Sequence, residues 1–144
     1  MITIKQFLGP EPKAVCTISP QDTAYKALEI MAEKDIGAVV VVKDEKVVGI
    51  FSERDYARKV ILKEKSSKNT AVKELMTDKV CYVRPEQTMD ECMALMTEKH
   101  MRHLPVIDGG KLIGIVSIGD VVKQIVKYKE FTIQQLENYI TGEI

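Results

Sequence analysis

Hydrophobic and polar residues follow the same order twice along this 144-residue chain. In the first half, apolar runs at 14–18, 38–42 and 47–51 have the length and β-branched content of short strands. Between the first two runs, apolar residues recur at helical spacing from Thr23 to Asp35. A polar turn at 43–46 joins the second and third runs, and a helix is predicted over 52–63. The pattern predicts the order β-α-β-β-α.

The second half repeats this order after a polar linker at 63–70. It predicts strands at 80–83, 104–107 and 112–116, a helix from Thr88 to His100, and a helix from Ser117 to about Lys127. Short apolar segments at 3–8 and 71–76 predict a lead-in helix before each half. The predicted fold class is α+β, with two β-α-β-β-α repeats packed pseudo-symmetrically through their sheets.

The repeat is visible residue by residue at a shift of 65, which places Pro20 over Pro85. The same ungapped shift pairs Gly49 with Gly114 and Asp55 with Asp120, and it mostly exchanges one apolar residue for another elsewhere. Two units of this size bury little surface alone, so we expect them to pack face to face in one globule. The predicted repeats are residues 1–66 and 67–144.

The last segment of the chain, "FTIQQLENYITGEI", predicts a separate C-terminal helix. Thr132 is its expected N-cap, and Ile133, Leu136 and Ile140 fall on one face. We expect this face to pack on the chain's own globule. The alternative is a contact with a second copy or with another protein.

Charge and composition narrow the function classes. Acidic and basic residues balance to a formal net charge of zero, which argues against a nucleic-acid surface or a polybasic membrane patch. The N-terminus does not resemble a signal peptide, and no apolar run is long enough to span a bilayer. Three cysteines without zinc-motif spacing suit a reducing compartment. We therefore expect a cytoplasmic protein.

A motif of the form G-apolar-apolar-S-x-x-D ends the hairpin of each half, as "GIFSERD" and "GIVSIGD". Ser52 with Asp55, and Ser117 with Asp120, match a helix capping box. Alternatively, a hydroxyl at a helix N-terminus binds phosphate, and a carboxylate one turn away accepts hydrogen bonds from a ribose diol. The preceding glycine leaves room for a close approach to the backbone. A nucleoside phosphate uses all of these groups.

Apolar residues near each motif are available to line a base. In one half these are Ile18 and Ile36 with the backbone at Gly37-Ala38. The other half offers Val83 and Met101 with the backbone around His103 and Leu104, which Pro105 follows. If the two sites face one central cleft, we expect Arg102 and His103 to share the phosphates with Arg54. Arg54 stands beside the first motif, whereas neutral Gly119 stands in the second. We expect Arg58 and Lys59 on a solvated helix face.

With these motifs in tandem, and with "GAVVVV" and "RHLPVI", the chain resembles a pair of CBS domains, or Bateman module. The resemblance covers about 15–62 and 80–127. It implies an adenosine-containing ligand between the repeats, with AMP as first choice and ATP, ADP, NAD(H) or S-adenosylmethionine as the others. It further implies ribose contacts from Asp55 and Asp120, phosphate contacts from Ser52 and Ser117, and weaker contacts from Asp22 and Gln87.

The sequence contains no nucleophile–base pairing, phosphate-binding loop or dinucleotide fingerprint that indicates an enzyme. His100 and His103 lack a third ligand at helical spacing, so no metal site is predicted. The expected function is a regulatory module that reports its bound nucleotide to an unidentified protein. The resemblance suggests a homodimer. The competing hypothesis is a structural interaction protein whose clefts stay empty, and a nucleotide-hydrolysing enzyme is a third, weaker one.

Overall fold

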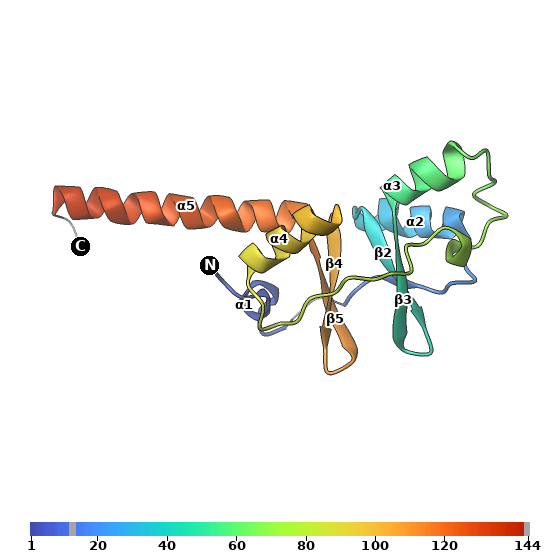
Figure 1. Cartoon of the computed structure of the whole chain (residues 1–144), viewed down its shortest axis with the longest axis horizontal. Coiled ribbons are helices and arrows are strands. Elements are labelled where there is room, and N and C mark those ends of the chain that lie inside the picture. Colours follow the sequence, from blue (N-terminus) through green and yellow to red (C-terminus); the bar gives the residue numbers. More distant parts are fainter. Residues whose placement is uncertain (12–13, 143–144) are drawn as a thin grey trace.

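Two units of similar topology lie side by side in the computed structural model, which describes residues 1–11 and 14–142 (Figure 1). The first unit contains β1 (Thr17–Ile18), α2 (Ala24–Lys34), β2 (Ala38–Lys43), β3 (Lys46–Ser52), α3 (Glu53–Tyr56) and the π-helical turn η1 (Ala57–Ile61). The second contains α4 (Met89–Lys99), β4 (His103–Asp108), β5 (Lys111–Ser117) and α5 (Ile118–Thr141). The mixed helix and strand content confirms the predicted α+β class.

The two sheets differ by one strand. In the first unit β1 pairs in parallel with β2, and β2 pairs antiparallel with β3. In the second unit only β4 and β5 form a sheet, and the strand predicted over 80–83 is reduced to a single bridge between Val83 and Val106. Pro105 explains why this strand does not form. Its counterpart, Val40, donates its N–H to the Cys16 carbonyl, and a proline has no N–H to give.

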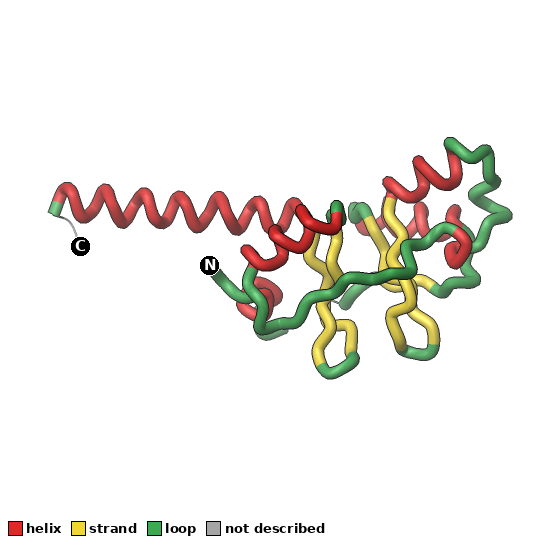
Figure 2. Tube along the Cα trace, in the orientation of Figure 1, coloured by secondary structure: helices red, strands yellow, loops and turns green. Residues whose placement is uncertain are grey.

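Each lead-in segment packs on the unit that it does not precede. The helix α1 (Ile4–Leu8) joins the second unit, where the Ile4 N–H donates to the Gln87 carbonyl at 2.8 Å. The segment η2 (Val72–Glu74), a 3₁₀ turn, joins the first unit, where the Val72 N–H donates to the Asp22 carbonyl at 2.8 Å. The chain between the units crosses both sheets (Figure 2). This exchange ties the halves together, and the repeat boundaries at 1–66 and 67–144 stay predictions.

Two hydrophobic cores result, one in each unit. The core of the first unit lies between α2, the β2–β3 hairpin and the turn at η2, and its largest buried side chain is Phe51. The core of the second unit lies between α1, α4, the β4–β5 hairpin and the start of α5, and it includes Ile4 and Met89. Because each core borrows apolar side chains from the other half's lead-in, neither repeat alone contains its whole core.

The C-terminal segment differs from its prediction. No new helix begins at Thr132, because α5 runs unbroken for 24 residues and the Thr132 hydroxyl donates to the Tyr128 carbonyl inside it. The face expected to pack on the globule is solvent-exposed, with Ile133 55%, Leu136 58% and Ile140 81% exposed. Figure 1 shows the second half of α5 extending beyond both units. The last two residues of the predicted segment, 143–144, lie outside the described residues.

Candidate functional site

Both Ser-x-x-Asp motifs form helix capping boxes. The Asp55 N–H donates to Ser52 Oγ at 3.1 Å, and the Ser52 N–H donates to Asp55 Oδ2 at 3.0 Å. In the second unit the matching distances between Ser117 and Asp120 are 3.1 Å and 2.8 Å. Each cap uses only Oδ2 of its aspartate, so the second carboxylate oxygen remains free of the cap. Capping and ligand binding are therefore compatible in one side chain.

The glycine of each motif serves the fold. A Cβ on Gly49 would lie 2.5 Å from Met76 Sδ, and a Cβ on Gly114 would lie 2.8 Å from Leu8 Cδ2. Both Met76 and Leu8 belong to the segments exchanged between the halves. The close approach predicted at these glycines is thus made by protein side chains, and the interpretation of the glycines as space for a ligand is corrected.

A cleft of about 400 Å³ opens where the helix start of the first unit faces the α4–β4 loop of the second. We call it the cationic cleft, because its lining holds five lysines and arginines against two carboxylates. Arg54 crosses between the units by donating from Nη1 to the His100 carbonyl at 3.3 Å. The lining residues are Gly37, Ile50, Ser52, Glu53, Arg54, Asp55, Arg58, Lys59, Thr77, Lys99, His100, Met101, Arg102 and His103.

Arg58 and Lys59 both line this cleft, and they remain solvated there, since Arg58 is exposed and the Lys59 side chain is 42% exposed. The Lys59 ammonium donates to the Leu75 carbonyl at 2.9 Å and lies 3.4 Å from Asp55 Oδ1. This pairing holds a positive charge beside the Asp55 carboxylate. The i,i+4 spacing of Asp55 and Lys59 was the sequence signal that could have placed Lys59 at the site.

A second hollow of about 330 Å³ lies on the other side of the pseudo-symmetric interface. We call it the acidic cleft, because Asp35 and Asp120 line it and no lysine or arginine does so among residues 1–11 and 14–142. Over the same described ranges, Asp120 Oδ1 has no hydrogen-bond partner. The lining residues are Val15, Cys16, Asp35, Ile36, Gly37, Ala38, His103, Ile115, Ser117 and Asp120.

Gly37 and His103 line both clefts and so form the wall between them. A Cβ on Gly37 would lie 3.3 Å from Glu53 Oε1 and 3.4 Å from His103 Nε2. Burial lowers the pKa of His103 below its usual 6.5; Asp120 and Glu53 oppose this shift, and Arg102 adds to it. The imidazole at this wall is therefore biased toward its neutral form.

The structure brings together eleven of the predicted site residues and leaves seven outside both clefts. Ile18, Val83, Leu104 and Pro105 are buried, the first three of them in the two cores. Asp22 accepts from the Ser19 N–H, and Gln87 accepts from the Arg84 N–H, so both stabilise local turns. The predicted residues that line one of the two clefts are Ile36, Gly37, Ala38, Ser52, Arg54, Asp55, Met101, Arg102, His103, Ser117 and Asp120. Those that line neither cleft are Ile18, Asp22, Val83, Gln87, Leu104, Pro105 and Gly119.

Sequence reasoning missed three charged residues of the clefts. Glu53 and Lys99 line the cationic cleft, and Asp35 lines the acidic one. Asp35 and His100 end α2 and α4 in the left-handed conformation, at φ 52° and 55°. Their shared place at a helix end, 65 residues apart, was the signal that could have marked this loop as a cleft wall.

In the described ranges, no group of three or more histidine, cysteine or acidic side chains is placed to hold a metal ion. Across the same residues, no helix combines the length and the apolar character needed to cross a membrane.

Comparison with known proteins identifies the repeated unit. The family model of the CBS domain matches the chain twice, at residues 6–62 and 72–127. The chain belongs to the CBS-domain family. This confirms the resemblance drawn from the paired motifs, and the match spans most of both units described above.

Solved CBS-domain structures share this architecture. A CBS-domain protein of Burkholderia ambifaria is 55% identical, with a TM-score of 0.83 over 88% of this chain and 95% of that one. The CBS-domain protein ATU1752 of Agrobacterium tumefaciens is 37% identical, with a TM-score of 0.80 over 85% and 98%. Both alignments extend across the two units, which confirms the predicted pair of repeats.

Among curated proteins, the mitochondrial CBS domain-containing protein CBSX3 of Arabidopsis thaliana is 44% identical over 126 residues. That alignment covers 84% of this chain and 61% of CBSX3. A protein of Methanopyrus kandleri is 36% identical over 84% of this chain and 62% of its own length. The chain thus spans about three fifths of the length of these relatives.

Proposed function

We propose that this chain is a regulatory CBS pair that binds an adenosine nucleotide in the cationic cleft. The carrying observation is the charge of that cleft, where five lysines and arginines face two carboxylates. A phosphate group is the ligand chemistry that such a surface favours. The volume of about 400 Å³ falls in the range of small-molecule sites. AMP is the first choice, with ADP, ATP and NAD(H) as the other phosphate-bearing candidates.

Each part of the nucleotide has a proposed partner in this cleft. Arg54 and Arg102 take the phosphate, since both arginines line the cleft and a guanidinium group suits phosphate. Asp55 accepts hydrogen bonds from the ribose diol through Oδ1, which gives up its contact with the Lys59 ammonium group when the ligand binds. Met101 supplies apolar surface for the base. Ser52 has a smaller role than its motif suggests, because its hydroxyl already donates to Asp55 Oδ2 at 3.1 Å.

The acidic cleft suits a different adenosine derivative. Asp35 and Asp120 would repel a phosphate, but Asp120 Oδ1 is available to a ribose diol. We propose that this cleft admits an adenosine compound without net negative charge, such as S-adenosylmethionine. The CBS-domain pair of protein MJ0100, 22% identical and alike in fold with a TM-score of 0.77, was solved with 5′-methylthioadenosine and S-adenosyl-L-methionine. Those ligands are of the chemical class proposed here.

Transmission would use the contacts that join the two units around the clefts. Arg54 bridges the units through the His100 carbonyl, and a phosphate that draws Arg54 away would weaken this bridge. Nucleotide binding then shifts the relative position or rigidity of the units, to which an unidentified protein or a second copy responds. A homodimer is part of this proposal, and a nucleic-acid or membrane partner is not.

A thermal-shift experiment on the full chain tests the proposal. AMP, ATP, NADH and S-adenosylmethionine are each titrated to millimolar concentration against the melting temperature, and isothermal titration calorimetry measures Kd for any hit. A ligand at a hundredfold excess over Kd stabilises the folded state by about 2.7 kcal/mol. The proposal predicts a rise with AMP and none with inorganic phosphate at the same ionic strength. No shift with any adenosine compound would overturn it.

The competing function is a structural interaction module with empty clefts. The observation that favours it is that both capping boxes account for Ser52, Asp55, Ser117 and Asp120 without a ligand. It predicts a melting curve that no nucleotide moves. If a ligand binds, its mass after overnight incubation decides the remaining question, because an unchanged nucleotide supports a sensor and a hydrolysed one indicates an enzyme.

The proposal includes a cytoplasmic location, on the basis of the three free thiols of Cys16, Cys81 and Cys92. CBSX3, by its name, is mitochondrial. Cell fractionation with antibody detection separates the two compartments, and enrichment in an organelle fraction would reject this location without affecting the nucleotide hypothesis.

A further inference from the structure

The C-terminal helix α5 carries an apolar stripe that the chain itself does not cover. Val122, Val126, Ile133, Leu136 and Ile140 follow one another at spacings of four or three residues, interrupted only by Lys129. This is the spacing of alternating seam positions in a coiled coil. All five side chains are between 46% and 81% exposed. We call Val122, Val126, Lys129, Ile133, Leu136 and Ile140 the heptad stripe.

The globule covers a different face of the same helix. Val121 is fully buried in the core of the second unit, and Ile125 packs against that core. Tyr128 lines shallow hollows shared with Met1, so the contact with the globule ends near this turn. Folding of the chain therefore leaves the heptad stripe open along its whole length.

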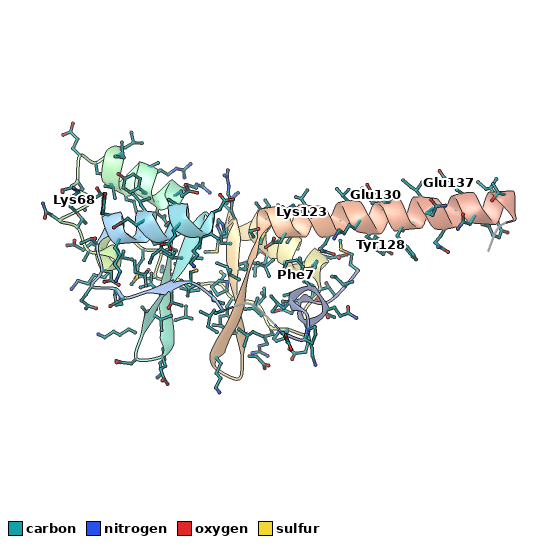
Figure 3. All side chains as sticks on the ribbon, turned by 180° about the vertical axis from the view of Figure 1, so that it is seen from behind. Phe7, Lys68, Lys123, Tyr128, Glu130 and Glu137 are labelled. Atoms are coloured by element: carbon teal, nitrogen blue, oxygen red, sulfur yellow. The ribbon has the colours of Figure 1, made fainter. Side chains whose placement is uncertain are left out.

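Charge divides α5 into two halves of opposite sign. Residues 118–129 hold three lysines against one aspartate, and residues 130–141 hold Glu130 and Glu137 with no lysine or arginine. Figure 3 labels Lys123, Glu130 and Glu137 along one edge of the helix and Tyr128 on the other edge. The helix dipole adds to this separation, because its positive end lies at the N-terminus, in the basic half. An antiparallel neighbour therefore places the positive end of each helix beside the negative end of the other.

We propose that α5 pairs antiparallel with α5 of a second copy of this chain, in a short two-stranded coiled coil. Centred near Phe131, this arrangement sets Val122 against Ile140 and Val126 against Leu136 of the second copy. It also sets Lys123 beside Glu137 of the second copy, on the edge of the seam, where charged residues determine orientation. A second copy is the occupant because the stripe and its flanking charges complement themselves.

A parallel pair fails on the same residues. It would place Lys129 against Lys129 inside the seam, and it would form no Lys123–Glu137 pair. In the antiparallel pair Lys129 meets Ile133 of the second copy, and Lys123 pairs twice with Glu137. The same register sets the two Glu130 carboxylates beside each other at the solvated edge, with the Lys129 ammonium groups next to them. Two lysines facing inside the seam oppose association more than two carboxylates at its edge, so the charge pattern selects the antiparallel orientation.

This inference does not depend on nucleotide binding, and its test uses the full chain without ligand. Sedimentation equilibrium measures the monomer–dimer constant of the wild type and of two variants that add one negative charge to the exposed part of α5. Leu136→Glu breaks the heptad stripe and should weaken the dimer at least tenfold. Gln134→Glu lies on the opposite face and should leave the constant unchanged.

The orientation is tested by exchanging charges. Lys123→Glu and Glu137→Lys should each weaken the dimer several-fold, and the double variant should regain wild-type affinity, because it restores both cross-pairs. Circular dichroism checks that helix content is kept in each. A monomeric wild type, equal effects of Leu136→Glu and Gln134→Glu, or a double variant weaker than either single one would each overturn the proposal.

Discussion

The two halves of this molecule share a backbone and differ in charge. Both end their hairpin in a Ser-x-x-Asp capping box, and both end the preceding helix in a left-handed residue. Yet the first half contributes Arg54 where the second has Gly119, and the second contributes Arg102 where the first has Gly37. Since each cleft draws on both halves, these exchanges concentrate the cations in one cleft and leave the other acidic.

The difference separates what the fold needs from what a ligand needs. Features kept in both halves, the caps and the glycines of the motif, have a structural partner in each half. Features that differ, such as Arg54 and Arg102, are charged side chains that line the cationic cleft. The residues most useful for predicting the ligand are therefore those in which the repeats disagree.

The largest expected effect follows from removing a cation of the cationic cleft. Arg102→Ala should weaken AMP binding about 10- to 100-fold, because a hydrogen bond to a charged group contributes roughly 1.5–3 kcal/mol. Titration calorimetry with AMP measures the change. Arg84→Ala is the matched control, since Arg84 is an exposed arginine of the same unit outside both clefts.

The same variant should leave binding of uncharged adenosine nearly unchanged, because the lost contact is to phosphate. Equal losses for AMP and adenosine would show that Arg102 acts on the base or on the fold. An AMP affinity equal to that of the wild type would remove Arg102 from the site.

A stability comparison between the motif glycines comes next. Gly49→Ala forces a Cβ against Met76 Sδ and to 3.1 Å from the Thr77 carbonyl oxygen, so the backbone has to move. Overpacking of this kind costs about 1–3 kcal/mol. Gly114→Ala meets only methyl groups of Leu8, which can rotate away, and should cost less.

Thermal unfolding followed by circular dichroism measures both glycine variants. The melting temperature should fall by several degrees for Gly49→Ala and by a smaller amount for Gly114→Ala. The reverse order, or two unchanged melting temperatures, would contradict the view that these glycines accommodate the exchanged segments.

Much of the fold was predictable because local signals and the repeat agreed. The helices α2 and α4 and both hairpins follow from apolar spacing, and the duplication let one half support the other. The loss of the strand predicted over 80–83, the counterpart of β1, was foreseeable, since Pro105 stands where Val40 donates a backbone hydrogen bond in the first unit. The exchange of lead-in segments was not, because residues 4 and 87 become neighbours only through tertiary packing.

The site was predictable in part for the same reason. Ser52, Asp55, Ser117 and Asp120 stand in a motif, and the motif sits at a helix start. Lys59 and Lys99 reach the cationic cleft from helix faces that sequence pattern alone treats as solvated. The continuous α5 was missed because Thr132 resembles an N-cap, although a threonine inside a helix can donate to the carbonyl four residues earlier.

A smaller effect distinguishes the two aspartates. Asp55→Ala and Asp120→Ala should each lower the free energy of unfolding by about 0.5–1 kcal/mol, since each removes the acceptor of a capping box near a helix N-terminus. Their effects on binding should differ: Asp55→Ala weakens AMP binding, and Asp120→Ala weakens binding of S-adenosylmethionine. Urea unfolding and calorimetry on both variants measure the two quantities, and a stability loss with all ligand affinities unchanged would favour the purely structural role.

The smallest expected effect concerns His103, which has Ala38 as its counterpart in the first half. Burial lowers the pKa of His103 in the folded protein below 6.5, so the unfolded chain binds more protons on acidification than the folded protein does. Folding stability from this group is therefore present above pH 6.5 and declines as the pH falls through the lower folded pKa.

The melting temperature should fall less between pH 7.5 and 5.5 in His103→Gln than in the wild type. His100→Asn, which keeps a residue suited to the left-handed conformation, is the control for the loss of a histidine outside this wall. If His103→Gln instead falls as steeply as the wild type, the imidazole in the wall between the clefts does not contribute to the acid sensitivity in this range.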